Sequence, residues 1–166
     1  MLIEMKVSGL TIDPITNTFI VILKSKQENK AIPIWIGLFE ASAIATELEK
    51  VVFSRPMTHD LLSECLKVLN VTVDRIVIED IRNNTFFANI YLIREGRDYT
   101  IDARPSDAIA LALRASAPIF VNEIVLEKSR SIDFGMKITD LDNLKEDKVK
   151  EFLENLSVED FGKYKM

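Results

Sequence analysis

The sequence has one cysteine, Cys65, among 166 residues. A single cysteine excludes an intrachain disulfide and any metal site built from several thiolates. No apolar run approaches the roughly 20 residues that a transmembrane helix requires. The first residues, Met-Leu-Ile-Glu-Met-Lys, also lack the apolar segment of a signal peptide. We therefore expect no association with a membrane, and we expect the protein in the cytoplasm.

Glycine and histidine are scarce as well, with five glycines and a single histidine, His59. The few glycines form neither a phosphate-binding Gly-rich loop nor a Gly-x-Ser-x-Gly nucleophile elbow. A metal site made of several histidines cannot form within one chain, and any Ser-His-Asp triad would have to use His59. A single histidine in the first turn of a helix more often has a structural role than a catalytic one.

Positive charge is outnumbered, because 21 Lys and Arg face 26 Asp and Glu and leave a net charge of −5. This balance argues against a broad basic surface for nucleic acid. It does not exclude a local site in which carboxylates surround a metal ion. The hydrophobic content of 48% is typical of a soluble globular protein.

Alternating and β-branched segments predict a sheet. Strands are expected at residues 2–10, 18–23, 31–36, 71–80, 85–94, 99–101 and 118–121, and helices at 39–51, 59–69 and about 105–115. Pro33 cannot donate to a ladder, so its strand is expected at an edge. We predict an α+β fold, with helices packed on a single mixed, mostly antiparallel sheet. Residues 1–128 are expected to form the domain, and 129–166 a C-terminal helical tail.

The segment from residue 98 to 118 joins a predicted strand to the helix that we expect at the centre of the fold. No residue from 108 to 113 is polar, and a helix that is apolar on every side is a buried helix. Pro105 has a fixed φ and no N–H, so it suits the first turn of that helix. The segment therefore predicts a strand that leads directly into a buried central helix.

Four polar side chains gather where this strand meets the helix: Asp102, Arg104, Ser106 and Asp107. Ser106 or Asp107 can accept hydrogen bonds from the free amides of the first turn, and the positive end of the helix dipole attracts anions. A purely structural explanation is also available, in which Asp102 pairs with Arg104 and Asp107 complements the dipole. The residues alone leave both interpretations open.

Carboxylates recur where predicted helices begin: Glu40, Asp60, Asp102 and Asp107. Carboxylates bind hard cations such as Mg²⁺ or Mn²⁺, and such an ion can polarise a phosphodiester and activate water. Arg104 has the fork geometry that holds a phosphate in bidentate fashion. Carboxylates at helix starts are also common as caps, so this pattern is suggestive of hydrolysis without being specific.

An internal echo is visible at an offset of 65 residues. The tripeptide Ala-Ile-Ala at 43–45 recurs at 108–110, and Ile36 and Ile101 match at the same offset. Each copy would consist of three strands followed by a helix. The echo indicates a duplication, although short apolar helices also coincide by chance.

Four motifs together resemble the bifunctional nuclease domain family. They are Ile-Pro-Ile-Trp-Ile-Gly at 32–37, Glu-Ala at 40–41, Arg-Pro-Met-Thr-His-Asp-Leu-Leu at 55–62, and Ile-Asp-Ala-Arg-Pro-Ser-Asp-Ala-Ile-Ala-Leu-Ala at 101–112. The resemblance runs from the N-terminus to about residue 128. It implies a metal-dependent nuclease that cleaves both DNA and RNA.

The matching polar residues then become candidates for the site. Their expected roles are metal binding and water activation by Glu40, Asp102 and Asp107, proton donation by His59, and substrate binding by Arg104 and Ser106. The expected cofactor is Mg²⁺ or Mn²⁺. The competing interpretation is a non-catalytic homo-oligomeric binding or regulatory module, in which the same groups are caps and salt bridges.

The predicted sheet has more apolar surface than one layer of helices can cover. Trp35 lies on the predicted edge strand, and Phe86, Phe87, Ile90 and Tyr91 occupy both faces of the second hairpin. Apolar patches of this kind usually have a partner, and a second copy is the commonest one. We expect a homodimer with the sheet or its edge strands in the interface. Cover by the C-terminal tail is the alternative.

Overall fold

The structure, a computed structural model, describes residues 1–27 and 29–130. These residues form one sheet from the strands β1 (Leu2–Ile12), β2 (Phe19–Ser25), β3 (Ala31–Ile36), β4 (Thr72–Arg82), β5 (Thr85–Arg94), β6 (Arg97–Ala103) and β7 (Ile119–Asn122). The helices of the same part of the chain are α1 (Leu38–Leu48), α2 (Thr58–Val68), α3 (Pro105–Ala115) and α4 (Glu123–Arg130). The predicted C-terminal tail helices lie outside the described residues.

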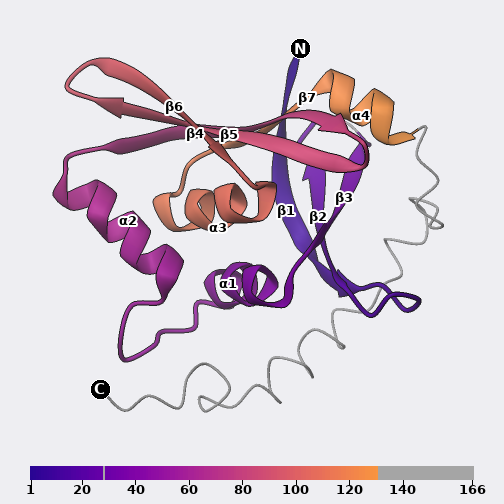
Figure 1. The fold of residues 1–166 in the computed structure, drawn as a ribbon, viewed down its shortest axis with the longest axis horizontal. Helices are drawn as coiled ribbons and strands as arrows, with labels where there is room; N and C mark the ends of the chain where they lie inside the picture. The colour runs from indigo at the N-terminus through magenta and orange to yellow at the C-terminus, as the bar shows by residue number, and fades with distance from the viewer. Residues whose placement is uncertain (28, 131–166) are drawn as a thin grey trace.

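The strands lie in the order β3-β2-β1-β7-β4-β5-β6 (Figure 1). Every neighbouring pair is antiparallel except β4 and β7, which run parallel. The expected α+β fold with a mixed, mostly antiparallel sheet is confirmed. β3 forms one edge of the described sheet, as Pro33 predicted, because a residue without an N–H is tolerated there.

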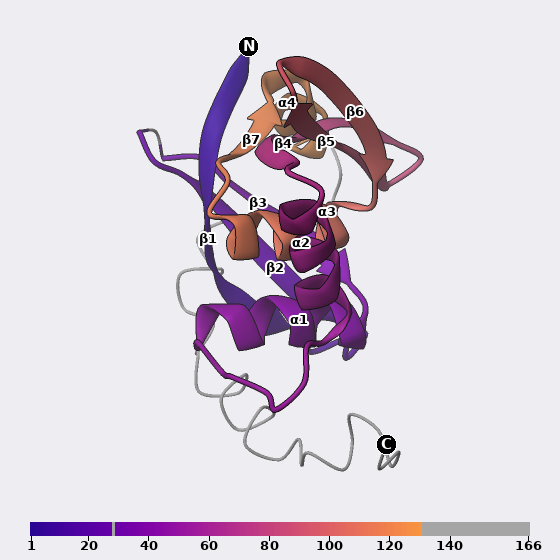
Figure 2. The ribbon, with the colours of Figure 1, turned by 90° about the vertical axis from the view of Figure 1, so that its left-hand side faces the viewer.

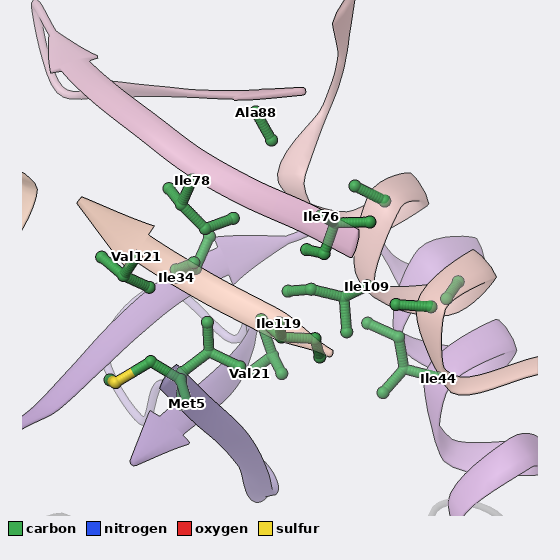
Figure 3. Close-up of a cluster of buried hydrophobic side chains, with 14 of the residues drawn as sticks. Met5, Val21, Ile34, Ile44, Ile76, Ile78, Ala88, Ile109, Ile119 and Val121 are labelled. Atoms are coloured by element: carbon green, nitrogen blue, oxygen red, sulfur yellow. The ribbon is translucent and has the colours of Figure 1, made fainter. Parts of the chain in front are cut away.

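The helices α1, α2 and α3 pack together on the sheet (Figure 2). α3 contacts β4, β5 and both other helices, while α1 contacts β2. Ile109 of α3 and Ile44 of α1 meet Ile76 of β4 in the core, and all three are fully buried (Figure 3). Burial of one such side chain contributes about 1.5–3 kcal/mol. The core therefore joins the two halves of the sheet through α3.

The order of three strands and a helix occurs twice, as the internal echo indicated. β1, β2 and β3 lead into α1, and β4, β5 and β6 lead into α3. The first strand of each half is irregular in register, with a shift between Val7 and Gly9 in β1 and two shifts in β4, between Val73 and Arg75 and between Ile78 and Asp80. β7 lies between these two first strands. The helices that end the two halves pack against each other.

α1 ends at Leu48 and not at Val51, and this boundary was predicted wrongly. Lys50 has a φ of 54°, and the Val51 N–H bonds to the carbonyl of Thr46. This is a Schellman ending, which usually has glycine at the left-handed position. Leu48 and Val51 are both exposed, because the chain turns away from the core there.

Asparagines define two local features of the backbone. Asn83 and Asn84 both have positive φ at the tip of the β4–β5 hairpin, as a type I′ turn requires. Asn122 caps α4, because its Oδ1 accepts from the Ile124 N–H at 3.3 Å. No helix in the described ranges is long and apolar enough to span a lipid bilayer.

Candidate active-site cleft

A cleft of about 320 Å³ lies where the N-termini of α1, α2 and α3 approach one another. Its lining includes residues from the first turn or cap of each helix: Phe39 and Glu40, Thr58 and His59, and Arg104 and Asp107. The N-terminus of a helix carries free amides and a positive dipole end. Three such ends at one cleft favour an anionic ligand.

Each of these helices has a carboxylate at its third position: Glu40, Asp60 and Asp107. An acid in the first turn is stabilised by the dipole. Asp60 also reaches back to accept the N–H of Met57 at 2.9 Å. Met57 is the N-cap of α2, and Thr58 is its first residue.

Four of the predicted site residues form a connected chain of polar contacts. The His59 Nε2 lies 2.9 Å from Asp107 Oδ1, and Arg104 Nε donates to Asp107 Oδ2 at 2.8 Å. Arg104 Nη1 also pairs with Glu40 Oε1 at 2.8 Å. This series of contacts links α2 through α3 to α1. It therefore places an imidazole, a guanidinium and two carboxylates in one cleft.

These contacts shift the pKa values of Asp107 and Arg104 in opposite directions. Burial raises the pKa of Asp107, but the hydrogen bonds from Arg104 and His59 outweigh burial and leave the pKa below its ordinary value. The hydrogen bond to Asp107 raises the pKa of Arg104 further above its already high value. Asp107 is therefore a carboxylate at neutral pH and can orient the imidazole.

A second network, which the sequence did not reveal, supports the cleft from within. The side chain of Arg114, in α3, is 7% exposed, and its Nε donates to Asp60 Oδ1 at 2.6 Å. Its Nη1 donates to the carbonyls of Ala43 and Ala110 at 3.0 Å each. Because Asp60 follows His59, this network fixes the start of α2. No local pattern signals a pair of residues that lie 54 positions apart.

Two of the predicted residues do not line the cleft. Asp102 of β6 lies opposite Asn89 of β5, and its neighbour Ile101 lies opposite the buried Ile90 of β5. Because side chains alternate along a strand, Asp102 lies on the other face of the sheet and is exposed. Ser106 is buried at the second position of α3. The predicted trio of Glu40, Asp102 and Asp107 is therefore not brought together.

The donors that remain fit a metal ion only in part. Among the described residues, no group of three or more His, Cys, Asp or Glu side chains is arranged to hold an ion. The cleft offers two carboxylates, Glu40 and Asp107, with Arg104 between them. Mg²⁺ is commonly held by one or two carboxylates together with substrate phosphates and water. Two carboxylates are thus enough for an ion that arrives with substrate.

The sequence matches the model of the "Bifunctional nuclease domain" over residues 21–133. The chain belongs to the bifunctional nuclease domain family. The matched range contains every cleft residue named above, from Phe39 to Arg114. The family that the motifs indicated is confirmed.

Two relatives match this protein over very different fractions of their length. The chain is 35% identical over 167 residues to "Uncharacterized protein Rv1829" of Mycobacterium tuberculosis, covering 95% of this chain and 97% of that protein. It is 24% identical over 94 residues to "Bifunctional nuclease 1" of Oryza sativa subsp. japonica, covering 55% of this chain and 28% of the rice protein. The relative that is named a nuclease is thus the more distant one.

Proposed function

We propose that the chain is a nuclease that cleaves phosphodiester bonds of DNA and RNA in this cleft. The observation that carries the proposal is the contact of His59, Asp107 and Arg104 at three converging helix N-termini. An acid–base group, its orienting carboxylate and a phosphate-binding guanidinium are the parts that phosphodiester hydrolysis needs. Membership of the bifunctional nuclease family supports the same reaction class.

His59 has the role of the proton-transfer group in this proposal. In the tautomer that donates Nε2–H to Asp107, Nδ1 carries the lone pair. That nitrogen can take a proton from water attacking phosphorus and then return it to the leaving oxygen. Asp107 acts by fixing the tautomer and stabilising the imidazolium that forms.

Arg104 has the role of the phosphate clamp. A guanidinium has five N–H donors, and Asp107 and Glu40 each accept one of them. The remaining donors are available to a phosphate, because the side chain is 67% exposed. Arg104 can therefore bind substrate without releasing the carboxylates that orient it.

We also propose that the reaction depends on Mg²⁺ or Mn²⁺, with Glu40 and Asp107 as the protein ligands. When bound, the ion would supply positive charge that stabilises the phosphorane-like transition state. The support for this assignment is that both carboxylates line one cleft, because carboxylate oxygens are the ligands that these hard cations prefer. Asp102 has no part in it, because its side chain lies on the other face of the sheet.

The test compares two Asp→Asn variants of the purified protein. Wild type should nick plasmid DNA and degrade RNA with Mg²⁺ or Mn²⁺, and EDTA should stop both reactions. Asp107→Asn should lower the rate by about 10²–10⁴-fold, because it removes the partner that orients His59. Asp102→Asn is the matched control and should retain the rate. Equal activity in wild type and Asp107→Asn would show that the activity comes from another site or another protein.

A second candidate function is a non-catalytic homo-oligomeric module. One observation favours oligomerisation: Tyr99 and Ile101 of β6 lie on the same face as the buried Ile90 and Leu92, yet they are 47% and 49% exposed. We propose that the chain forms a homodimer through this edge. A homodimer is compatible with either function, and the Asp107→Asn comparison separates the nuclease from the non-catalytic module.

A further inference from the structure

Phe39 is a large apolar side chain held in an unfavourable place. It is the second residue of α1, directly before Glu40, and it is 75% exposed. An isolated exposed apolar residue needs no explanation by itself. Phe39, however, lines the cleft together with Glu40, His59 and Arg104. It therefore presents an aromatic ring where the charged groups of the proposed site meet solvent.

The rest of the cleft indicates what such a ring would contact. Arg104 and the three helix N-termini provide positive potential for a phosphate. Phe53, from the segment between α1 and α2, is a second aromatic residue of the lining. Cationic groups interleaved with aromatic rings are the arrangement with which proteins bind single-stranded nucleic acid, because each base can stack on a ring.

We propose that Phe39 is a stacking platform for one unpaired base, and that the substrates are single-stranded DNA or RNA. The inference rests on the proposed nuclease function, because it adds a base subsite to the same cleft. A base within a duplex has both faces covered by its neighbours, so it must leave the stack to lie on Phe39. The cleft volume of about 320 Å³ is at the small end of ligand pockets, roughly 300–1,000 Å³, and suits one nucleotide better than a duplex.

The test is a binding measurement that does not depend on cleavage. The probe is a fluorescein-labelled oligothymidylate with phosphorothioate linkages, and its affinity is measured by anisotropy in Mg²⁺. Phe39→Ala should weaken binding about 5- to 150-fold, the effect of losing one stacked base. Phe39→Leu should lose most of the affinity, and Phe39→Tyr should keep it. Leu61→Ala, which truncates another exposed apolar side chain on α2, is the matched control and should bind like wild type.

Two further probes distinguish stacking from other roles. An oligomer of abasic sugar-phosphate should bind wild type and Phe39→Ala equally, since it has no base to stack. Phe39→Trp should show fluorescence quenching by oligothymidylate, and the wild type, whose only tryptophan is Trp35, provides the background signal. A duplex of the same length should bind wild type more weakly than the single strand.

Each result separates this inference from the proposed function. Equal affinity of wild type and Phe39→Ala, or equal affinity for duplex and single strand, overturns the stacking role even if cleavage is observed. Phe39-dependent binding without any cleavage overturns the nuclease and leaves the base subsite in place. A change of molecular mass in Phe39→Ala without a change of affinity would mean that Phe39 joins two copies of the chain, and would overturn the inference.

Discussion

At the scale of single residues, each acid in the first turn of a cleft helix pairs with an arginine. Glu40 and Asp107 share Arg104, and Asp60 pairs with Arg114. The negative charges near the proposed phosphate site are thus partly neutralised locally. The overall charge of −5 therefore does not prevent an anion from entering this cleft.

Asp60 should matter for stability rather than for chemistry. Burial raises the pKa of Asp60, but the hydrogen bonds from Arg114 and from the Met57 N–H together outweigh burial and leave the pKa below its ordinary value. Asp60→Asn should lower the free energy of unfolding by about 1.5–3 kcal/mol, because the buried Arg114 loses a charged partner. Urea unfolding measures the loss. Asp98→Asn on the exposed part of β6 should change stability by no more than about 0.5 kcal/mol, and an equal loss in both variants would contradict the role of Asp60.

Four of the six predicted site residues lie together in the cleft, and residue type and position at a helix start carried the signal for them. Glu40, His59, Arg104 and Asp107 all precede or open a helix, where polar side chains are expected. The face on which Asp102 lies depends on the register of β6 against β5, which the sequence does not reveal. The importance of Arg114 depends on how α2 packs beside α3, which is a tertiary property.

At the scale of elements, both polar networks of the cleft depend on α3, which contributes Asp107 from its first turn and Arg114 from its last. Its residues 108–112 are buried, as the run without polar residues predicted, and only Leu113 of the run is half-buried. The prediction succeeded because a helix that is apolar all round has one stable location. The C-terminal end of α1 was harder to predict, because Lys50 adopts the left-handed conformation that usually marks glycine.

A larger side chain inside α3 should therefore be costly. Ala110 is fully buried and its carbonyl accepts from Arg114. Ala110→Leu should lower stability by about 1–3 kcal/mol through overpacking, and Ala115→Leu, at the less buried end of the helix, is the control. Thermal unfolding of the two variants gives the comparison. An unchanged melting temperature in Ala110→Leu would show that the core has room that the structure does not contain.

At the scale of the whole molecule, the apolar face of β6 makes a dimer testable. Light scattering after size exclusion should give about twice the 18.9 kDa of one chain. Ile101→Asp should shift the mass toward one chain, because a charge in an apolar interface is costly. Ile15→Asp, at an exposed turn, should leave the dimer intact. A mass of one chain in wild type over a wide concentration range would rule out the dimer.

The position of β7 has a consequence for how the protein is made. β7 joins β1 to β4 in the middle of the sheet, yet it follows all the other described strands along the chain. A ribosome therefore completes both outer groups of strands before it delivers residues 119–122, which join them. Until then, Ile3 of β1 and Ile78 of β4 lack the neighbour that covers their strands. Pairings between distant segments form slowly, so the nascent chain exposes two unpaired strand edges late in its synthesis, when contact with a chaperone would matter most.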